Sequence, residues 1–335
     1  MRLEQLHIVW RILAISLILV VVLVATIFLG LSFGPTGSVS QTVDTIFHEK
    51  NVHPMYHTII WQIRFPRVLL AALVGATLSL GGLVFQALLR NPLAEPYILG
   101  ISGGSAIGAI IGILLGLSRF PGVSLTAFIG SLATLGLILV MTTGQSILKK
   151  ESLLLSGVMV NAFCSAVILF LISLAQDSRL HNILFWLMGD LSIANMRQVA
   201  ILAAMLFPCF VFIFWLSHSM NLLLMGKELA QTMGVNIKAV TLALMITASF
   251  MVSVTVSYCG LLGFIGLVMP HLLRLLWGSD HRVLVPACIL GGGAFLAACD
   301  LLARALPEHG EMPPGVITAL IGAPLFIFLL KKSGR

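Results

Sequence analysis

Charged residues are scarce in this chain, and acidic ones are the scarcest. Of its 335 residues, 9% are charged, against roughly 25% in a typical soluble domain. Only 12 are Asp or Glu, whereas 59% are hydrophobic. The net charge of +7 comes from scattered Lys and Arg, which form no nucleic-acid-binding motif. This composition excludes a soluble globular protein and indicates a membrane protein whose basic residues lie in loops.

Motifs for catalysis and metal binding are also missing. There is no Walker A motif, so the chain cannot bind and hydrolyse ATP by itself in that manner. The five cysteines occur singly in apolar runs without metal-ligand spacing, as buried small hydrophobes do. No Asp or Glu lies in the middle of an apolar run, where proton- or sodium-coupled carriers place them. His48, His53 and His57 could hold a metal, but Pro54 and the lack of helical periodicity favour plain surface histidines.

Long apolar runs dominate what is present. Several runs of about 17 to 25 residues are long enough to cross ~30 Å of hydrocarbon. We therefore predict an all-α polytopic membrane protein, with one transmembrane domain over residues 1–335. The first run is too long for a signal peptide and is kept as an uncleaved span. The ten predicted spans are 8–31, 66–89, 98–117, 123–143, 153–175, 198–217, 239–258, 261–277, 283–302 and 315–331.

The loops between these spans predict the orientation. With the N-terminus inside, twelve Lys and Arg fall on the cytoplasmic side and seven on the outer side. This bias favours cytoplasmic termini. It also places the loop over residues 218–238 in the cytoplasm.

That cytoplasmic loop contains a short helical pattern. Leu229 and Met233 lie four apart and share one helix face, between Gly226 and Gly234. So short a helix is marginal alone in water, so it implies a docking partner. On spacing alone, an ordinary solvated loop is the better interpretation.

Three further segments carry local signals. Pro92 and Pro96 prevent a continuous helix after span two, which suits a broken element lining a pathway. Asp300 and Arg304 are spaced as a helical ion pair. Apolar residues in 176–197 suggest an interfacial helix.

Five segments in order resemble the FecCD-type permeases, the membrane subunits of ABC importers for iron–siderophore complexes, haem and cobalamin. They are RFPRVLLAALVGATLSLGG, RNPLAEPYILG, LLLMGKELAQTMGV, GLLGFIGLVMPHLLR with GSDHR, and EMPPGVITALIGAPLFIFLL. The resemblance implies a ten-span homodimeric permease in the inner membrane. Each copy would contact membrane lipid and a separate ATPase subunit. A periplasmic or lipoprotein substrate-binding protein would deliver the substrate.

The resemblance also implies roles for individual residues. His271 and Arg274 belong to the family pattern without an assigned role. The residues implied to couple to the ATPase are Gly226, Lys227, Glu228, Leu229, Ala230, Met233 and Gly234. Those implied to gate the exit are Asn91 and Leu93, with Glu151 and Ser152 as a second gate, and those implied to dock the binding protein are Arg64, Arg67 and Arg304. For Arg64 and Arg67, the alternative is snorkelling at the lipid interface.

The function expected from this resemblance is ATP-driven import of a large metal chelate from periplasm to cytoplasm. The chain itself would bind no cofactor, because ATP and Mg²⁺ belong to the partner ATPase. A secondary carrier or channel working without an ATPase is the alternative, and a membrane-embedded enzyme is a remote third. The residues do not separate an iron siderophore from haem or cobalamin.

Overall fold

The computed structural model describes residues 2–33, 45, 54–142, 150–307 and 310–333, in which helices are joined by turns and short links and no strand occurs. Their helices group into two compact units, each assembled from separate stretches of the chain. The first unit contains residues 1–83, 191–218 and 264–335, and the second contains 84–190 and 219–263. Whether the chain is one domain, as expected, stays a prediction.

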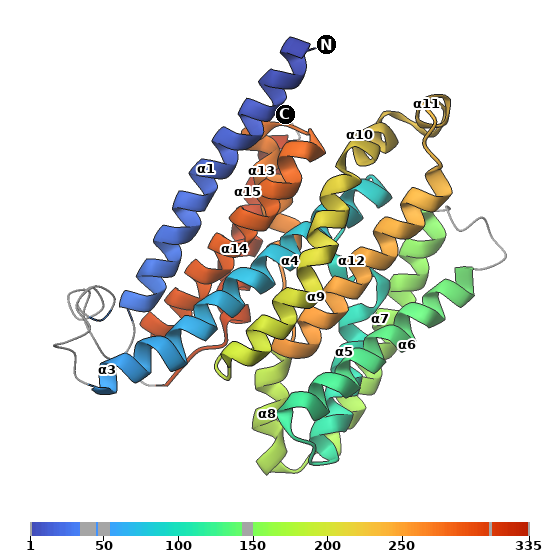
Figure 1. The fold of residues 1–335 in the computed structure, drawn as a ribbon. Helices are drawn as coiled ribbons and strands as arrows, with labels where there is room; N and C mark the ends of the chain where they lie inside the picture. Colours follow the sequence, from blue (N-terminus) through green and yellow to red (C-terminus); the bar gives the residue numbers. More distant parts are fainter. Residues whose placement is uncertain (1, 34–44, 46–53, 143–149, 308–309, 334–335) are drawn as a thin grey trace. The chain divides into compact units, whose positions relative to one another are not determined.

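The first unit is built around α14. A Cβ added to Gly292 would lie 2.3 Å from the Cβ of Ser79 and 2.5 Å from the carbonyl oxygen of Gly75, so α4 and α14 pack backbone to backbone. Helix α1 runs alongside α14 (Figure 1). The elements of this unit are α1 (Arg2–Ser32), α3 (Pro54–Thr58), the π-helix η2 (Ile59–Arg64), α4 (Phe65–Leu89, up to Leu83), α9 (Met196–Trp215), α13 (Ile265–Trp277), α14 (His281–Ala305) and α15 (Pro314–Ser333).

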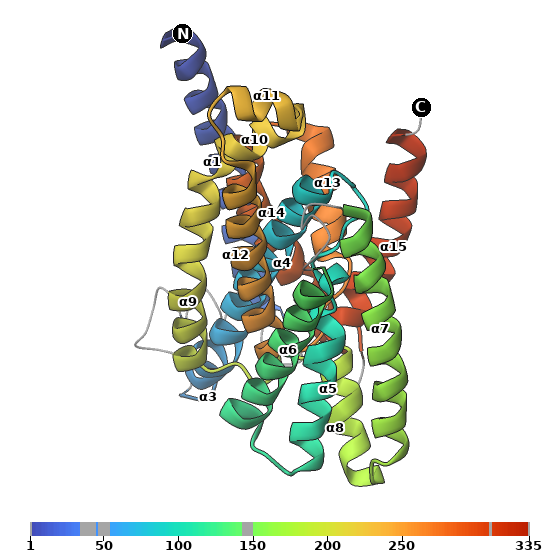
Figure 2. The ribbon, with the colours of Figure 1, turned by 90° about the vertical axis from the view of Figure 1, so that its right-hand side faces the viewer.

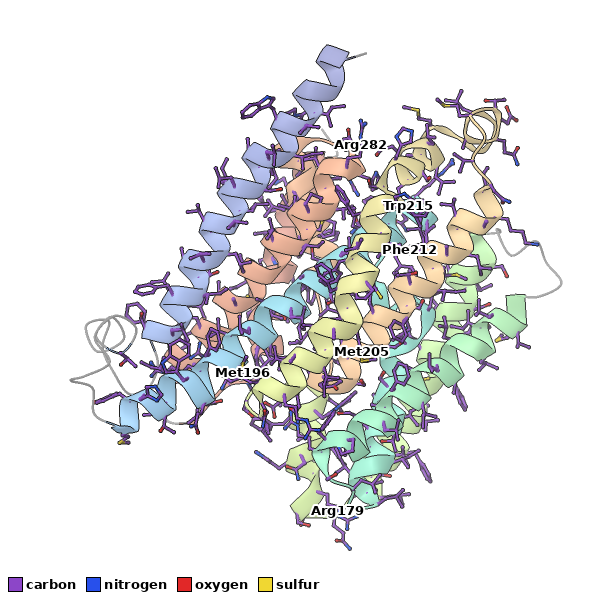
Figure 3. The ribbon with its side chains drawn as sticks, in the orientation of Figure 1. Arg179, Met196, Met205, Phe212, Trp215 and Arg282 are labelled. Atoms are coloured by element: carbon purple, nitrogen blue, oxygen red, sulfur yellow. The ribbon has the colours of Figure 1, made fainter. Side chains whose placement is uncertain are left out.

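Helix α9 turns an apolar face outward. Trp215 is 75% exposed and Phe207 is 67% exposed, and Trp215 and Phe212 stand near one end of this helix (Figure 3). Leu202 and Leu206, on another face, are fully buried. A helix that is apolar on both its buried and its exposed faces is typical of a membrane span.

In the second unit, α5, α6 and α7 pack together (Figure 2). Small residues allow this, because a Cβ on Gly104 would lie 2.3 Å from the carbonyl oxygen of Gly130 on α6. Gly108 approaches α6 as closely, since an added Cβ would lie 2.1 Å from the carbonyl oxygen of Thr126. The elements are the end of α4 from Val84, η3 (Pro96–Leu99), α5 (Ile101–Leu114), η4 (Arg119–Val123), α6 (Ser124–Thr142), α7 (Lys150–Ser173), α8 (Asp177–Leu187), α10 (Ser217–Met225, from Ser219), α11 (Lys227–Thr232) and α12 (Ile237–Cys259).

The predicted spans agree with the helices of the described residues. Seven helices are long and apolar enough to cross a membrane, and three shorter apolar helices, α5, α13 and α15, complete the ten predicted spans. The chain is thus a multi-pass α-helical membrane protein. The link between α12 and α13 is longer than predicted, because it covers residues 260–264 whereas the predicted spans leave only 259–260 between them. Gly260 at its start has φ 74°, a conformation that favours glycine.

The expected interfacial helix exists, as α8, but its apolar face is largely covered. Ile183 is fully buried and Trp186 is 5% exposed, whereas Leu184 is 43% exposed. Helix α8 packs against α5 in the same unit. Its apolar residues therefore serve mainly the protein core.

Candidate functional site

The predicted coupling helix is present as α11, between two glycines in positive φ. Gly226 has φ 126° and ψ 154°, a combination essentially restricted to glycine. Gly234 has φ 82° and donates its N–H to the carbonyl of Gln231. The glycine boundaries inferred from the sequence are confirmed.

One side of α11 is buried in the protein and another is exposed. Ala230 is fully buried, whereas Leu229 is 47% exposed and Met233, one residue past the helix, is 58% exposed. Met233 donates its backbone N–H to the carbonyl of Leu229 at 3.1 Å, which puts the two residues one turn apart. Glu228 is exposed in the first turn, where a negative charge favours the helix dipole. The side chain of Lys227 lies outside the described residues. An exposed apolar pair on a two-turn helix suits a protein partner.

The first predicted gate is an ordered turn directly after α4. Asn91 accepts the N–H of Leu93 on its side-chain oxygen at 2.9 Å. Its own carbonyl accepts the N–H of Ala94 at 3.1 Å. Leu93 is 48% exposed, whereas Ala94 is fully buried. The turn is therefore anchored by its hydrogen bonds and by buried Ala94, and it exposes the side chain of Leu93.

The second predicted gate lies at the start of α7. Ser152 is half-buried there, and the side chain of Glu151 lies outside the described residues. Five residues past Ser152, α7 touches η3, since a Cβ on Gly157 would lie 2.0 Å from the carbonyl oxygen of Ile98. Helix α7 thus packs on the short helix that follows the first gate.

Tyr97, in the same short helix, is hydrogen-bonded to the link that follows α12. Its hydroxyl donates to the carbonyl of Leu262 at 3.0 Å and accepts the N–H of Leu262 at 3.2 Å. Burial raises the pKa of Tyr97 well above its usual value. The phenol stays neutral, so it keeps the proton that this double contact needs.

The three arginines predicted to dock a binding protein come together in the first unit, around Asp300. Arg67 pairs with Asp300 at 2.9 Å and with Glu311 at 2.5 Å, and Arg304 pairs with Asp300 at 3.1 Å. The ion pair predicted between Asp300 and Arg304 is confirmed. Asp300 itself is fully buried, whereas the Glu311 side chain is 43% exposed.

Two of these arginines also hold the end of α1. Arg64 donates to the carbonyl of Leu31 at 2.7 Å, and Arg304 donates to the carbonyl of Gly30 at 3.0 Å. Arg64, Arg67 and Arg304 are 5%, 3% and 4% exposed. This burial against protein groups is not a snorkelling arrangement. The docking role stays a prediction, with Glu311 as the accessible member of the cluster.

The remaining titratable residues show no metal-binding arrangement within the described part of the chain, where no three His, Cys, Asp or Glu gather. His57 is exposed, and His48 and His53 lie outside the described residues. His271 is buried on α13 with its ring 6.0 Å from that of Phe326. This contact indicates a packing role within α13.

Similarity to known proteins decides the family. Residues 17–332 match the model of the FecCD transport family. The chain belongs to the FecCD transport family. It is 41% identical to the vitamin B12 import system permease protein of Salmonella arizonae, over 82% of this chain and 84% of that protein. It is 36% identical to an uncharacterised ABC transporter permease protein of Bacillus subtilis, over 93% of this chain and 92% of that protein.

A solved structure supports the same family fold. An inward-facing metal-chelate-type ABC transporter superposes with a TM-score of 0.85 at 31% identity, covering 95% of this chain and 99% of that chain. PsaBC from Streptococcus pneumoniae in complex with Fab, at 19% identity and a TM-score of 0.57, is similar in fold alone.

Sequence reasoning missed two contacts of this FecCD-family chain. Arg90, directly before the first gate, donates to the carbonyl of Leu223 on α10 at 2.5 Å. Arg119 pairs with Asp190 at 2.6 Å. The positions of Arg90 and Arg119 at helix ends were visible in the sequence, but their partners 133 and 71 residues away were not.

Proposed function

We propose that this chain is the permease subunit of an ATP-driven importer that carries a large metal chelate from periplasm to cytoplasm. It works as a homodimer in the inner membrane with both termini in the cytoplasm. An ATPase subunit supplies ATP hydrolysis with Mg²⁺, and a periplasmic or lipoprotein binding protein delivers the chelate. The observation that carries the proposal is the family match over residues 17–332.

The ATPase engages the exposed side of α11. Leu229 and Met233 are exposed apolar side chains on a helix that is otherwise held by buried Ala230. Fully burying such a side chain is worth roughly 1.5–3 kcal/mol. Burial of both side chains gives α11 enough affinity for the ATPase to follow its movement through a small interface.

The binding protein engages the surface around Arg64, Arg67 and Arg304. Their cluster brings three arginines together with the acids Asp300 and Glu311, and Glu311 is the exposed acid among them. Charged groups at such a surface orient the approach of a partner of complementary charge. Glu311, the exposed acid on Arg67, is the group that a partner carboxylate can displace.

The names of the relatives direct the choice of substrate to test first. The vitamin B12 permease of Salmonella arizonae, at 41% identity, points to cobalamin. The metal-chelate-type transporter, at 31% identity, points to the wider class of iron chelates.

The test is uptake into proteoliposomes that contain this chain, its ATPase and its binding protein. Labelled cobalamin, a ferric hydroxamate siderophore and haemin are supplied in turn, with and without internal ATP and Mg²⁺. We expect one of the three to accumulate only with ATP. Uptake of none, or uptake driven by an ion gradient without the ATPase, would instead favour the secondary carrier or channel.

A further inference from the structure

Arg90 occupies a backbone position suited to glycine. It follows the last residue of α4 with φ 48°, in the left-handed region. Among the described residues, Phe264 is the one other non-glycine residue with positive φ. Left-handed backbone is strained for an L-residue with a long side chain. An arginine here therefore points to a use for its side chain.

The Arg90 side chain reaches the helix that leads into α11. Its guanidinium donates to the carbonyl of Leu223 at 2.5 Å. Leu223 lies in the last turn of α10 (Ser217–Met225), where carbonyls have no partner within the helix. A cation at this end also favours the helix dipole. Leu223 precedes Gly226, where α11 begins, by three residues.

The backbone of Arg90 continues directly into the turn that contains the first predicted gate, Asn91 and Leu93, called the gate turn below. Asn91 is the next residue, and its N–H donates to the carbonyl of Gln86 at 3.2 Å. Its side-chain oxygen then accepts the N–H of Leu93. A continuous path of one peptide bond and two hydrogen bonds thus joins the end of α10 to Leu93, entirely within the second unit.

We propose that Arg90 is the positioning residue that transmits movement of α11 to the exit turn at Asn91 and Leu93. This inference rests on the proposed function. When the ATPase shifts α11, the carbonyl of Leu223 moves with it, and the planar guanidinium carries the displacement to the backbone of Arg90. The Arg90 contact thereby keeps the end of α10 and the turn in step.

The test uses the complex of this chain with its ATPase and a reporter cysteine, Leu93→Cys. The rate of labelling by a water-soluble maleimide is measured without nucleotide and with ATP and Mg²⁺. Four of the native cysteines are buried and Cys209 lies within α9, so the chain without the reporter gives the background rate. In the otherwise unchanged chain we expect nucleotide to alter the rate at least about fivefold, the low end of typical coupling between sites.

Arg90→Gly separates a transmitting role from a structural one. Glycine suits the backbone at this position, so assembly with the ATPase and thermal stability should persist while the nucleotide effect on the Leu93→Cys rate falls below about twofold. Arg90→Lys, which keeps the charge but not the planar fork, should retain part of it. Arg179→Gln is the matched control, because Arg179 on α8 (Figure 3) also donates to a helix-end carbonyl, that of Leu114, away from this path.

The outcomes separate this proposal from the one on which it rests. A full nucleotide effect in Arg90→Gly overturns the role of Arg90 and leaves the permease function intact. An equal loss in Arg179→Gln shows a general requirement for helix-end arginines and also overturns it. No nucleotide effect in the unchanged chain, or no co-purified ATPase, refutes the gate or the ATPase partnership and the Arg90 role with it.

Discussion

Asp300→Asn tests how strongly the arginine cluster holds the first unit together. The carboxylate of Asp300 is fully buried and accepts the Nε–H of both Arg67 and Arg304. Asparagine keeps the size and one acceptor oxygen but removes the negative charge. Two buried guanidiniums then lose their shared counter-charge. Breaking a buried ion pair by removing one partner costs about 3–5 kcal/mol, and we expect a loss in that range.

The chain contains a matched control for this change. Asp280 pairs with Arg282 at 2.7 Å, but the two side chains are 26% and 35% exposed. Screening by solvent limits such a pair to about 0–1 kcal/mol. Asp280 also caps α14 through the N–H of Arg282, a role that asparagine fills equally well. Asp280→Asn therefore removes the charge of a solvent-accessible pair while it keeps the cap.

The assay measures the fraction of detergent-solubilised protein that stays folded and unaggregated after heating for a fixed time. It is chosen because membrane proteins of this size commonly unfold irreversibly. Asp300→Asn should lose its folded fraction at a clearly lower temperature than Asp280→Asn. If Asp300→Asn does not fold at all, adding Arg304→Gln removes one uncompensated cation and should restore part of the yield. Equal midpoints for the two Asn variants, or no effect of the second change, would refute the reasoning.

The other predictions concern α11, the gate turn and helix packing. Leu229→Asp should abolish co-purification of the ATPase, because a charge would be buried without a partner; normal ATP-coupled transport would contradict this. Cysteines placed at Asn91 and Leu93 should crosslink to their dimer mates and block transport until reduced, and the gate assignment fails if neither crosslinks in any nucleotide state. Gly104→Ala should cost ~1–3 kcal/mol of thermal stability through overpacking, whereas Gly136→Ala, with open space at its Cβ, should gain ~0.5–1 kcal/mol.

The spans and the helix breaks were predictable because they depend on local sequence. Apolar runs fix where helices can cross the membrane, and each of the ten corresponds to a helix. Pro92 and Pro96 act on the residues directly beside them, and a turn followed by η3 is found there. Gly226 and Gly234 likewise mark the ends of α11 through their own backbone conformations.

Burial and long-range pairing were not predictable, for two physical reasons. An apolar residue gives the same sequence signal whether lipid or protein covers it, so Trp186 of α8 was expected at the membrane interface although it is buried in the protein. The partner of an arginine depends on tertiary packing. Arg67 and Asp300 are 233 residues apart, and no local pattern links them.

Several arginine side chains of this chain donate to carbonyls at helix ends. Much of its small number of charged residues therefore has a structural role. Each of these arginines donates to a carbonyl in the last turn of another helix, where intrahelical partners run out and lipid supplies none. Within the described part of the chain, five such pairs occur: Arg11 with Trp277, Arg64 with Leu31, Arg90 with Leu223, Arg179 with Leu114 and Arg304 with Gly30. A fixed positive charge also opposes the negative end of the helix dipole. Arg64 and Arg304 thus serve as helix caps, and their docking role stays a prediction to be tested against that structural role, as the Arg90→Gly and Arg179→Gln comparison does for Arg90.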